Sequence, residues 1–491
     1  MAETGGHELG RDLCPGSSVT ARGIIQHIWS GLELPSHMLD ALHLKGIGHL
    51  LPTSFRVADL AQALIALSAL TASLVDATHN SSQTLRSVTV DRKLAVCEFA
   101  SEQLYSLNGK PAPSGWGPLE GLHKTKDGSV RMHDSFPNHR TAALKLLGLP
   151  EGAAREDVAA KIATWNAIDL EAAAQENKAV MYALRSYDQR DATLQAQAVP
   201  SFPISIVKLN SSVPAGPPAH LPLDADRCLR GVRVLDLSRV IAAPVAGKTL
   251  AAHGANVLWV TSPHLPSLPE LDVDVQRGKR TVQLDLDDPS DADKLRDLVK
   301  SADVFLQSYR PSPLAARDFS SAELMKLKPG VVVANLSAWG SEGPWKEARG
   351  FDSMVQTASG LNVSEALHCG DESSAKPLPL QALDHASGYL LATGIAAALY
   401  KRSREGGSWE VNVSLAGVGK FLRSLGQVDG KAGFEGDVRR PEELIQADMM
   451  EERKTGFGTL RAVRHSASIE GMMPGWDVMP KHLGSDEAVW L

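Results

Sequence analysis

The sequence predicts an α/β protein with a large parallel-sheet domain and a smaller α+β domain. Two observations predict this class. After residue 228, short apolar stretches typical of buried strands alternate with helical stretches, and a run rich in proline at 213–227 separates them from the first part of the chain. Such alternation is typical of a parallel sheet with helices on both faces. The chain of 491 residues can form two or three domains with a sizeable core.

The second part of the chain begins with the clearest strand and helix signals. Residues 232–237 form a short continuous apolar run that predicts a buried strand, and residues 249–253 end a helix that Gly254 can cap. Taken together, residues 231–244 and 250–260 predict a strand, a loop, a helix and a second strand. No Gly-x-Gly-x-x-Gly motif follows the first strand, so a nicotinamide-dinucleotide site is not predicted.

The first part of the chain contains a stretch that resembles a later one. Residues 58–75 are similar to residues 383–400, and Ser87–Asp91 follows the first as Glu410–Ser414 follows the second. Asp59 then aligns with Asp384. This order of helix, loop and strand indicates a worn repeat. Two unrelated helices rich in alanine and leucine remain the alternative, and for Asp59 a helix-cap role is expected.

Asp384 is the most informative residue. It lies at the start of the apolar helical run that continues to Tyr400, after a segment with two prolines. A carboxylate at a helix N-terminus is stabilised by the helix dipole and by free backbone N–H groups. We therefore expect Asp384 to be ionised and able to act as a nucleophile. The alternative is a simple N-cap aspartate.

Several motifs in a fixed order resemble the class III CoA-transferase (CaiB/BaiF) family, which includes formyl-CoA transferase, carnitine CoA-transferase and alpha-methylacyl-CoA racemase. These motifs span roughly 228–425. They are Gly231–Pro244, Leu250–Val260, Gln276–Arg280, Val282–Leu286, Ala302–Leu306, Ala338–Trp345, Gly350–Asp352, Pro379–Gly388 and Glu410–Ser414.

The resemblance implies a Rossmann-like large domain, with halves that are rearranged or partly duplicated. The expected divisions are a degenerate repeat at 1–115, a small-domain-like segment at 116–212, a linker at 213–227 and a large CoA-binding catalytic domain at 228–491. Residues 456–463 are expected to form a C-terminal return strand onto that large domain.

The resemblance also implies a reaction. Asp384 matches the catalytic aspartate, which attacks an acyl-CoA thioester to give an aspartyl anhydride and then an aspartyl-CoA thioester. Asp352 matches a second catalytic carboxylate. The implied activity is transfer of CoA from an acyl-CoA to a small carboxylic acid. CoA thioester is the substrate, and no permanently bound cofactor or metal is expected.

For CoA, the family pattern falls on residues at predicted strand ends, where open parallel sheets bind ligands. They are Arg239, Val240, Ile241, Lys279, Ser308, Tyr309, Arg349 and Leu415. The cations Lys279, Arg280, Arg310 and Arg349 suit the phosphates, and Tyr309 suits stacking on adenine. At Ile241 and at 261–262 the sequence departs from the family pattern, which disfavours formate and oxalate as acceptors.

Two alternatives to CoA transfer remain open. One is an alpha-methylacyl-CoA racemase, in which a histidine stands at the position of Phe351. Phenylalanine cannot transfer protons, so this alternative is disfavoured. His385 is expected to be a surface residue without a role. The other alternative is a non-catalytic CoA-binding paralogue. His133, Asp134 and His139 meet no metal spacing and are expected to be solvated loop residues.

Composition restricts the partners. The net charge of −7 disfavours nucleic acid, and the four scattered cysteines indicate neither disulfides nor a zinc site. The acidic start has no leader pattern, and the apolar runs near 60–75 and 389–400 are too short to span a membrane. We expect a cytoplasmic protein without a membrane or nucleic-acid partner, with a mitochondrial location left open. The resemblance implies an interlocked homodimer or a pseudo-dimer within one chain.

Overall fold

The computed structural model describes residues 19–491, apart from 83, 114, 212, 219 and 371–373. The acidic start of the chain and Cys14 therefore lie outside the described residues. The predicted mixed α/β class is confirmed, because a seven-stranded sheet and its covering helices form the centre of the molecule.

The large sheet has the strand order β11–β10–β9–β12–β13–β14–β8. Strands β9 to β14 are all parallel, and β8 is antiparallel to β14. The parallel strands follow the order 3-2-1-4-5-6, in which the chain reverses direction across the sheet between the first and fourth strands. The strands are β8 (Ile204–Lys208), β9 (Arg233–Leu237), β10 (Asn256–Thr261), β11 (Lys279–Gln283), β12 (Val304–Gln307), β13 (Val332–Ser337) and β14 (Trp409–Ser414).

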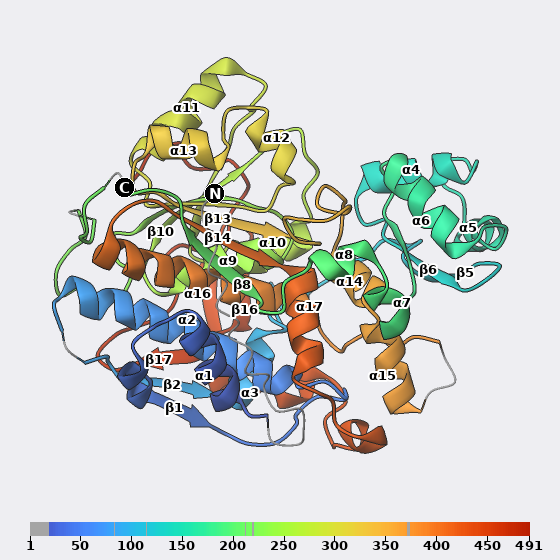
Figure 1. Ribbon diagram of the computed structural model, residues 1–491, viewed down its shortest axis with the longest axis horizontal. Helices are drawn as coiled ribbons and strands as arrows, with labels where there is room; N and C mark the ends of the chain where they lie inside the picture. The colour runs from blue at the N-terminus through green and yellow to red at the C-terminus, as the bar shows by residue number, and fades with distance from the viewer. Residues whose placement is uncertain (1–18, 83, 114, 212, 219, 371–373) are drawn as a thin grey trace, which may run out of the picture.

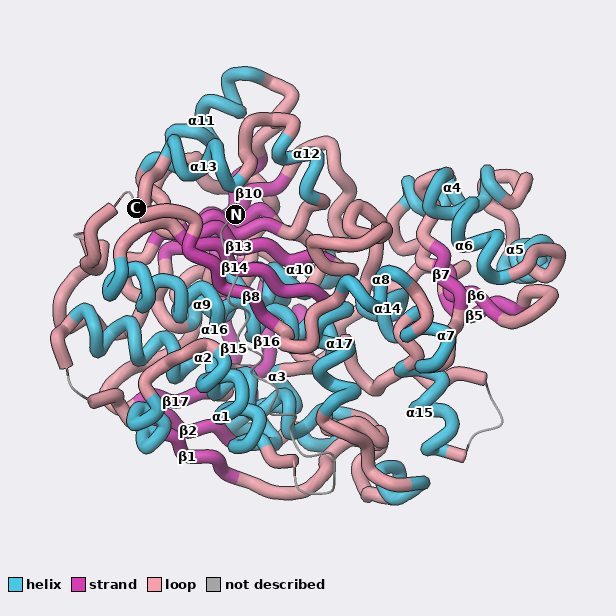
Figure 2. Tube along the Cα trace, in the orientation of Figure 1, coloured by secondary structure: helices cyan, strands magenta, loops and turns pink. Residues whose placement is uncertain are grey.

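Helices cover both faces of this sheet, with α11 and α13 on one side and α9 and α16 on the other (Figure 2). Alternate residues of each strand enter the two separate hydrophobic clusters: Val234 belongs to one and Leu235 to the other. The helices after residue 228 are α9 (Ala242–Ala252), α10 (Pro269–Val275), α11 (Pro289–Lys300), α12 (Pro311–Ala315), α13 (Ser321–Leu327), α14 (Asp352–Ala358), α15 (Leu361–Cys369), α16 (Ala382–Glu405) and α17 (Leu415–Ser424).

The N-terminal part packs against the large domain through two long helices, α2 and α16, which lie side by side (Figure 1). Apolar residues of both helices belong to one continuous core. Each helix precedes a strand that pairs in parallel with an earlier one, β1 with β2 and β13 with β14. The elements are α1 (Ala21–Gly31), η1 (Ser36–Ala41), β1 (Leu42–Lys45), α2 (Val57–His79), β2 (Val88–Asp91), α3 (Arg92–Glu98), β3 (Ser106–Leu107) and β4 (Lys110–Pro111).

Helix α2 is longer than the apolar run that the sequence analysis identified. Among the described residues it is the one helix long and apolar enough to cross a membrane by length and composition, and its most apolar window is wholly buried inside the protein. Core helices of soluble proteins pass the same test.

A smaller lobe with its own hydrophobic cluster lies at one side of the molecule (Figure 1). Its three-stranded antiparallel sheet has the order β5–β6–β7. The elements of this segment are β5 (Gly121–Lys124), β6 (Ser129–Met132), α4 (Pro137–Leu146), α5 (Arg155–Ile162), α6 (Ala167–Glu176), β7 (Met181–Ala183), α7 (Tyr187–Asp191) and α8 (Leu194–Ala198).

The predicted return strand differs from the structure. Strand β16 pairs with β15 and β3, and β17 pairs with β2, so both strands join the N-terminal part. The edge of the large sheet beside β14 is occupied by β8, which precedes the proline-rich linker. The remaining elements are η2 (Gly430–Phe434), η3 (Pro441–Leu444), η4 (Ala447–Met449), β15 (Met450–Thr455), β16 (Gly458–Val463) and β17 (Ala467–Ile469).

Close packing of α16 on α9 depends on Gly388. A Cβ atom at this position would lie 2.4 Å from the carbonyl oxygen of Ala242 and 2.7 Å from Val245. We expect Gly388→Ala to lower the free energy of unfolding by about 1–3 kcal/mol, because overpacking outweighs the gain of about 1 kcal/mol in helix propensity. Chemical denaturation measures this change.

Gly419 in α17 provides the matched control. A Cβ atom there would meet its nearest neighbour, Leu361, at 3.5 Å, which is ordinary contact. Gly419→Ala should therefore be neutral or slightly stabilising. Equal destabilisation by both substitutions would contradict the proposed role of Gly388.

Candidate active site

The residues predicted to bind CoA come mostly from one edge of the large sheet. Arg239, Val240 and Ile241 follow β9, Ser308 and Tyr309 follow β12, and Leu415 follows β14. Because these strands are parallel, their carboxyl ends lie at the same edge. This edge includes the point between β9 and β12 where the chain reverses direction, which is where open α/β sheets bind ligands.

Helix α16 brings Asp384 to this same edge. The helix precedes the parallel strand β14 and runs back across the sheet, so its first turn lies near the carboxyl ends of the strands. Asp384 is the third residue of the helix, and Gln381 is the N-cap. Asp384 is therefore not a cap. It shares a helix face with Gly388, which contacts the start of α9.

Asp352 occupies the position that we expected Asp384 to have. It lies in the first turn of α14 and is 1% exposed. Its Oδ2 accepts hydrogen bonds from the backbone N–H groups of Leu383, at 2.8 Å, and Asp384, at 3.0 Å, and its Oδ1 accepts one from Gln356. Asp352 is thus the anion at the N-terminus of α16.

We expected Asp384 to be ionised by the N–H groups at the start of α16, but these groups donate to Asp352 instead. Burial raises the pKa of Asp384 well above the usual value, and the negative charges of Asp352 and Glu102 raise it further. Within the described part of the chain, no hydrogen bond to its carboxyl group compensates. Burial raises the pKa of Asp352 to about 6, although backbone and Gln356 hydrogen bonds oppose the shift. Burial and the two neighbouring carboxyl groups therefore favour the protonated form of Asp384.

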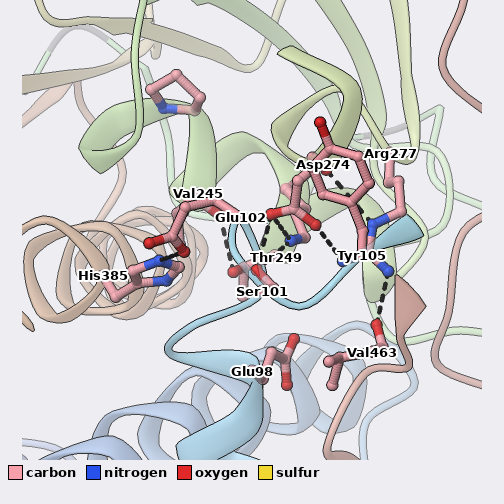
Figure 3. A network of polar contacts seen from close by, with 12 residues as sticks. Glu98, Ser101, Glu102, Tyr105, Val245, Thr249, Asp274, Arg277, His385 and Val463 are labelled. Carbon is pink, nitrogen blue, oxygen red and sulfur yellow. Dashed lines mark hydrogen bonds and ion pairs between the residues drawn. The ribbon is translucent and has the colours of Figure 1, made fainter. Parts of the chain in front are cut away.

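His385 is buried rather than on the surface, contrary to the prediction. It is 1% exposed, and its Nε2 lies 2.8 Å from Oε2 of Glu102, a residue 283 positions earlier in the chain (Figure 3). Its ring stacks on Phe99, with centroids 5.6 Å apart. No local sequence motif marks Glu102, because it approaches the site only after the chain has folded.

The smaller lobe covers the site. His133 stacks on Phe351, with ring centroids 3.9 Å apart and planes 7° from parallel. Phe136 lies 4.8 Å from the guanidinium of Arg239. His133, Asp134 and His139 are 2%, 0% and 7% exposed, so the prediction that they are solvated is wrong. They are buried because this lobe packs on the loops that lead into α14.

Three arginines surround His139. Burial, together with the positive charges of Arg349, Arg239 and Arg310, lowers the pKa of His139 to about 4. These arginines come from three separate loops at the carboxyl edge of the sheet. The structure therefore brings two of the predicted phosphate-binding cations, Arg310 and Arg349, near the predicted CoA residue Arg239, and Arg310 is exposed.

The other two predicted cations have partners within the protein. Nζ of Lys279 lies 2.7 Å from Asp236 and 2.7 Å from the carbonyl oxygen of Pro244, and Lys279 is fully buried. Arg280 donates to the carbonyl oxygens of Val489 and Glu487. A direct phosphate contact is not supported at either residue. Lys279 instead ties β11 to β9 and to the start of α9.

The loop after β9 has a strained backbone. Val240 has a φ angle of +70°, which is unfavourable for a β-branched residue. Such strain is typical of ligand-binding and catalytic loops. Arg239 and Val240 line a small pocket together with the following residues: Phe136, Trp259, Thr261, Ser262, Leu265, Pro266, Ser267, Leu268, Asp272 and Leu483.

The remaining predicted CoA residues are less accessible. Ile241 and Leu415 are buried, and Tyr309 is half-buried against the hydrophobic cluster on one face of the sheet. The backbone N–H of Ser308 donates to the carbonyl of Leu237. Stacking of Tyr309 on adenine stays a prediction.

Asp59, which aligns with Asp384 in the predicted repeat, does not have a similar environment. It lies in the first turn of α2, where Arg56 is the N-cap, so it is not the expected helix cap. It forms a buried ion pair with Arg92 at 2.9 Å. Among the described residues, no group of three His, Cys, Asp or Glu side chains could hold a metal ion.

Comparisons with known proteins find a family model and several similar proteins. The family model "CoA-transferase family III" matches residues 229–447. An acetyl-coenzyme A transferase (nodX) of Hypoxylon pulicicidum is 30% identical over 331 residues, which cover 63% of this chain and 55% of that protein. A formyl-CoA:oxalate CoA-transferase of Rhodopseudomonas palustris is 29% identical over 38% of this chain and 46% of that protein.

A solved structure is also similar. The crystal structure of Rv3272 from Mycobacterium tuberculosis is 29% identical, with a TM-score of 0.37, and the match covers 41% of this chain and 59% of that one. The chain spans about half the length of the curated relatives it matches.

Proposed function

Since residues 229–447 match the family model "CoA-transferase family III", we propose that this protein transfers CoA from an acyl-CoA to a carboxylic acid, with Asp384 as the nucleophile. One observation carries the proposal. Asp384 and Asp352 form a carboxyl pair at the start of α16, at the edge of the sheet where the β9 and β12 loops meet. Three arginines lie at the same edge and suit the phosphates of CoA.

The proposed reaction proceeds in two exchanges. The Asp384 carboxylate attacks the thioester carbonyl, which forms an aspartyl mixed anhydride and releases CoA thiolate. The thiolate then attacks the aspartyl carbonyl, which gives aspartyl-CoA and the donor acid. The acceptor carboxylate repeats these two exchanges in reverse and leaves as its CoA thioester. A thiolate with a pKa near 8.5 is a good leaving group, so a carboxylate is a sufficient nucleophile.

Two features of the site bear on this reaction. Asp384 must lose its proton before it attacks, so the rate should rise with pH as Asp384 ionises. Asp384 is also only 7% exposed, so an acyl-pantetheine arm reaches it only when the covering loops and the smaller lobe move apart.

Racemisation remains the less favoured alternative. Phe351 cannot transfer a proton, and burial lowers the pKa of the neighbouring His133 to about 3, so its imidazole is neutral at pH 7. A protein that binds CoA without catalysis is the third possibility.

Intact-mass measurement tests the three alternatives. The protein is incubated with a panel of acyl-CoAs, and we expect a mass increase from an acyl or CoA adduct that hydroxylamine removes. Solvent deuterium at the α-carbon of the acyl group, without an adduct, would instead indicate racemisation. CoA binding with neither result would leave a binding protein and overturn the proposal.

Arg310 tests the proposed phosphate site. Its side chain is exposed, and within the described residues its guanidinium makes no hydrogen bond or ion pair, so its removal should not destabilise the fold. We expect Arg310→Ala to weaken CoA binding about tenfold or more, because charge-assisted hydrogen bonds to a phosphate are lost. Isothermal titration calorimetry with CoA measures the change.

Arg317 is the matched control, since it is an arginine just beyond α12 that pairs with Asp287. Arg317→Ala should leave CoA affinity unchanged. An equal loss of affinity in both variants would point to a general charge effect and contradict a specific role for Arg310.

A further inference from the structure

Glu102 reaches the candidate active site from the N-terminal part of the chain. It follows α3 and is 5% exposed. One carboxylate oxygen lies 2.8 Å from Nε2 of His385, and the other accepts a hydrogen bond from Gln103 at 2.8 Å. The ring of Phe99, from the end of the same helix, stacks on both His385 and Tyr389 of α16. The end of α3 and the residues after it therefore hold the first two turns of α16.

Glu102 adds a third buried carboxyl group beside Asp384 and Asp352. The negative charge of Glu102 raises the pKa of Asp384, whereas His385 lowers the pKa of Asp352. From the smaller lobe, Arg131 also faces Asp352. The negative charges of two buried carboxyl groups, Asp352 and Glu102, thus act on Asp384.

The other charged groups on elements packed against α16 have partners of their own. On α9, Lys248 pairs with Asp274 at 2.7 Å. On α3, Glu98 pairs with His465 at 2.8 Å. On α2, Asp59 pairs with Arg92, as described above. Among the described residues, none of these groups shifts the pKa of Asp384.

We propose that Glu102 is a positioning residue of the nucleophile's site: it fixes His385 at the start of α16 and brings a negative charge to the neighbouring Asp384. The N-terminal part would then complete the active site within the same chain. This inference rests on the proposed function only for the role of Asp384 as nucleophile, because the contact between Glu102 and His385 is present without substrate.

A titration in the absence of substrate tests the inference. The protein is labelled with carboxyl-¹³C aspartate, and the Asp384 resonance is assigned by its loss in Asp384→Asn. We expect Glu102→Gln to increase the acid dissociation constant of Asp384 about tenfold, since a neighbouring negative charge is removed while the side-chain shape is kept. Glu102→Asp keeps the charge and should leave Asp384 close to its original midpoint.

Glu98→Gln is the matched control. Glu98 belongs to an equally buried Glu–His pair four residues earlier, but it does not act on Asp384. An unchanged midpoint in Glu102→Gln, or an equal shift in Glu98→Gln, would overturn the inference. If Glu102→Gln does not fold, an Asp384 midpoint in Glu102→Asp as low as that of an exposed aspartate would overturn it instead.

The two proposals fail separately. A protein that forms no adduct with any acyl-CoA would refute the transferase function and leave the titration result intact. A protein that forms the adduct but shows no effect of Glu102→Gln on the titration would refute only the role of Glu102.

Discussion

Replacement of Asp384 by asparagine is expected to abolish adduct formation and to lower the rate of CoA transfer by at least about 10³-fold, because the amide cannot form the acyl anhydride. The fold should survive this change. Asparagine has nearly the same shape, and one of three neighbouring carboxyl groups is removed from a buried site. Rates of acyl-CoA consumption, compared between the two proteins at equal thermal stability, provide the measurement.

Asp59→Asn is the informative control for this experiment. Asp59 aligns with Asp384 in the predicted repeat, yet its partner is Arg92. We expect Asp59→Asn to reduce stability, because a buried arginine loses its counter-ion, and to leave adduct formation intact. Full activity in Asp384→Asn would contradict the proposed mechanism. An inactive but folded Asp59→Asn would show that helix α2 also participates.

Substitution of Asp274 should have the largest effect on stability. This carboxylate is fully buried in α10 and contacts Lys248 at 2.7 Å, Arg277 at 2.5 Å and Ser101 at 2.7 Å (Figure 3). It thereby joins α9, α10 and the N-terminal part. Asp274→Asn removes the counter-ion of the buried Lys248 and leaves the buried Arg277 with only its longer ion pair to Glu451, at 3.4 Å, so the free energy of unfolding should fall by about 3–5 kcal/mol. Urea denaturation monitored by circular dichroism measures it.

The pH dependence of this contribution follows from the shift in pKa. Burial alone would raise the pKa of Asp274, but Lys248 and Arg277 lower it well below its usual value. A carboxyl group with a lowered pKa stabilises the protein above its unfolded pKa, near 4, and this stabilisation is lost as the pH falls further. The difference between the two proteins should therefore be constant from pH 5 to 7 and shrink in strong acid.

Asp293 offers a contrast, since its ion pair with Arg296 lies on the surface. Asp293→Asn should change the free energy of unfolding by less than about 1 kcal/mol. If Asp274→Asn were as mild as this control, the buried network would not be what joins the N-terminal part to α9 and α10.

The prediction of the sheet edge succeeded because its signals are local. Apolar runs such as 232–237 are buried on both faces of a parallel sheet, and the polar residues that follow them must then lie at its carboxyl edge. The resemblance to the family then singled out Arg239, Ser308 and Arg349 among the residues that follow these strands. The return strand was misplaced, because the pairing of an edge strand depends on partners far away in the chain.

The sequence by itself therefore determined the α/β class and the sheet edge, since both follow from neighbouring residues and short-range periodicity, and its resemblance to a family singled out Asp384 and Asp352. Only the tertiary structure decided the buried environment of Asp384, the burial of His133 and His139, and the approach of Glu102. Burial and electrostatic interaction act through space. They depend on side chains that are separated by hundreds of residues in the chain and meet only in the folded protein.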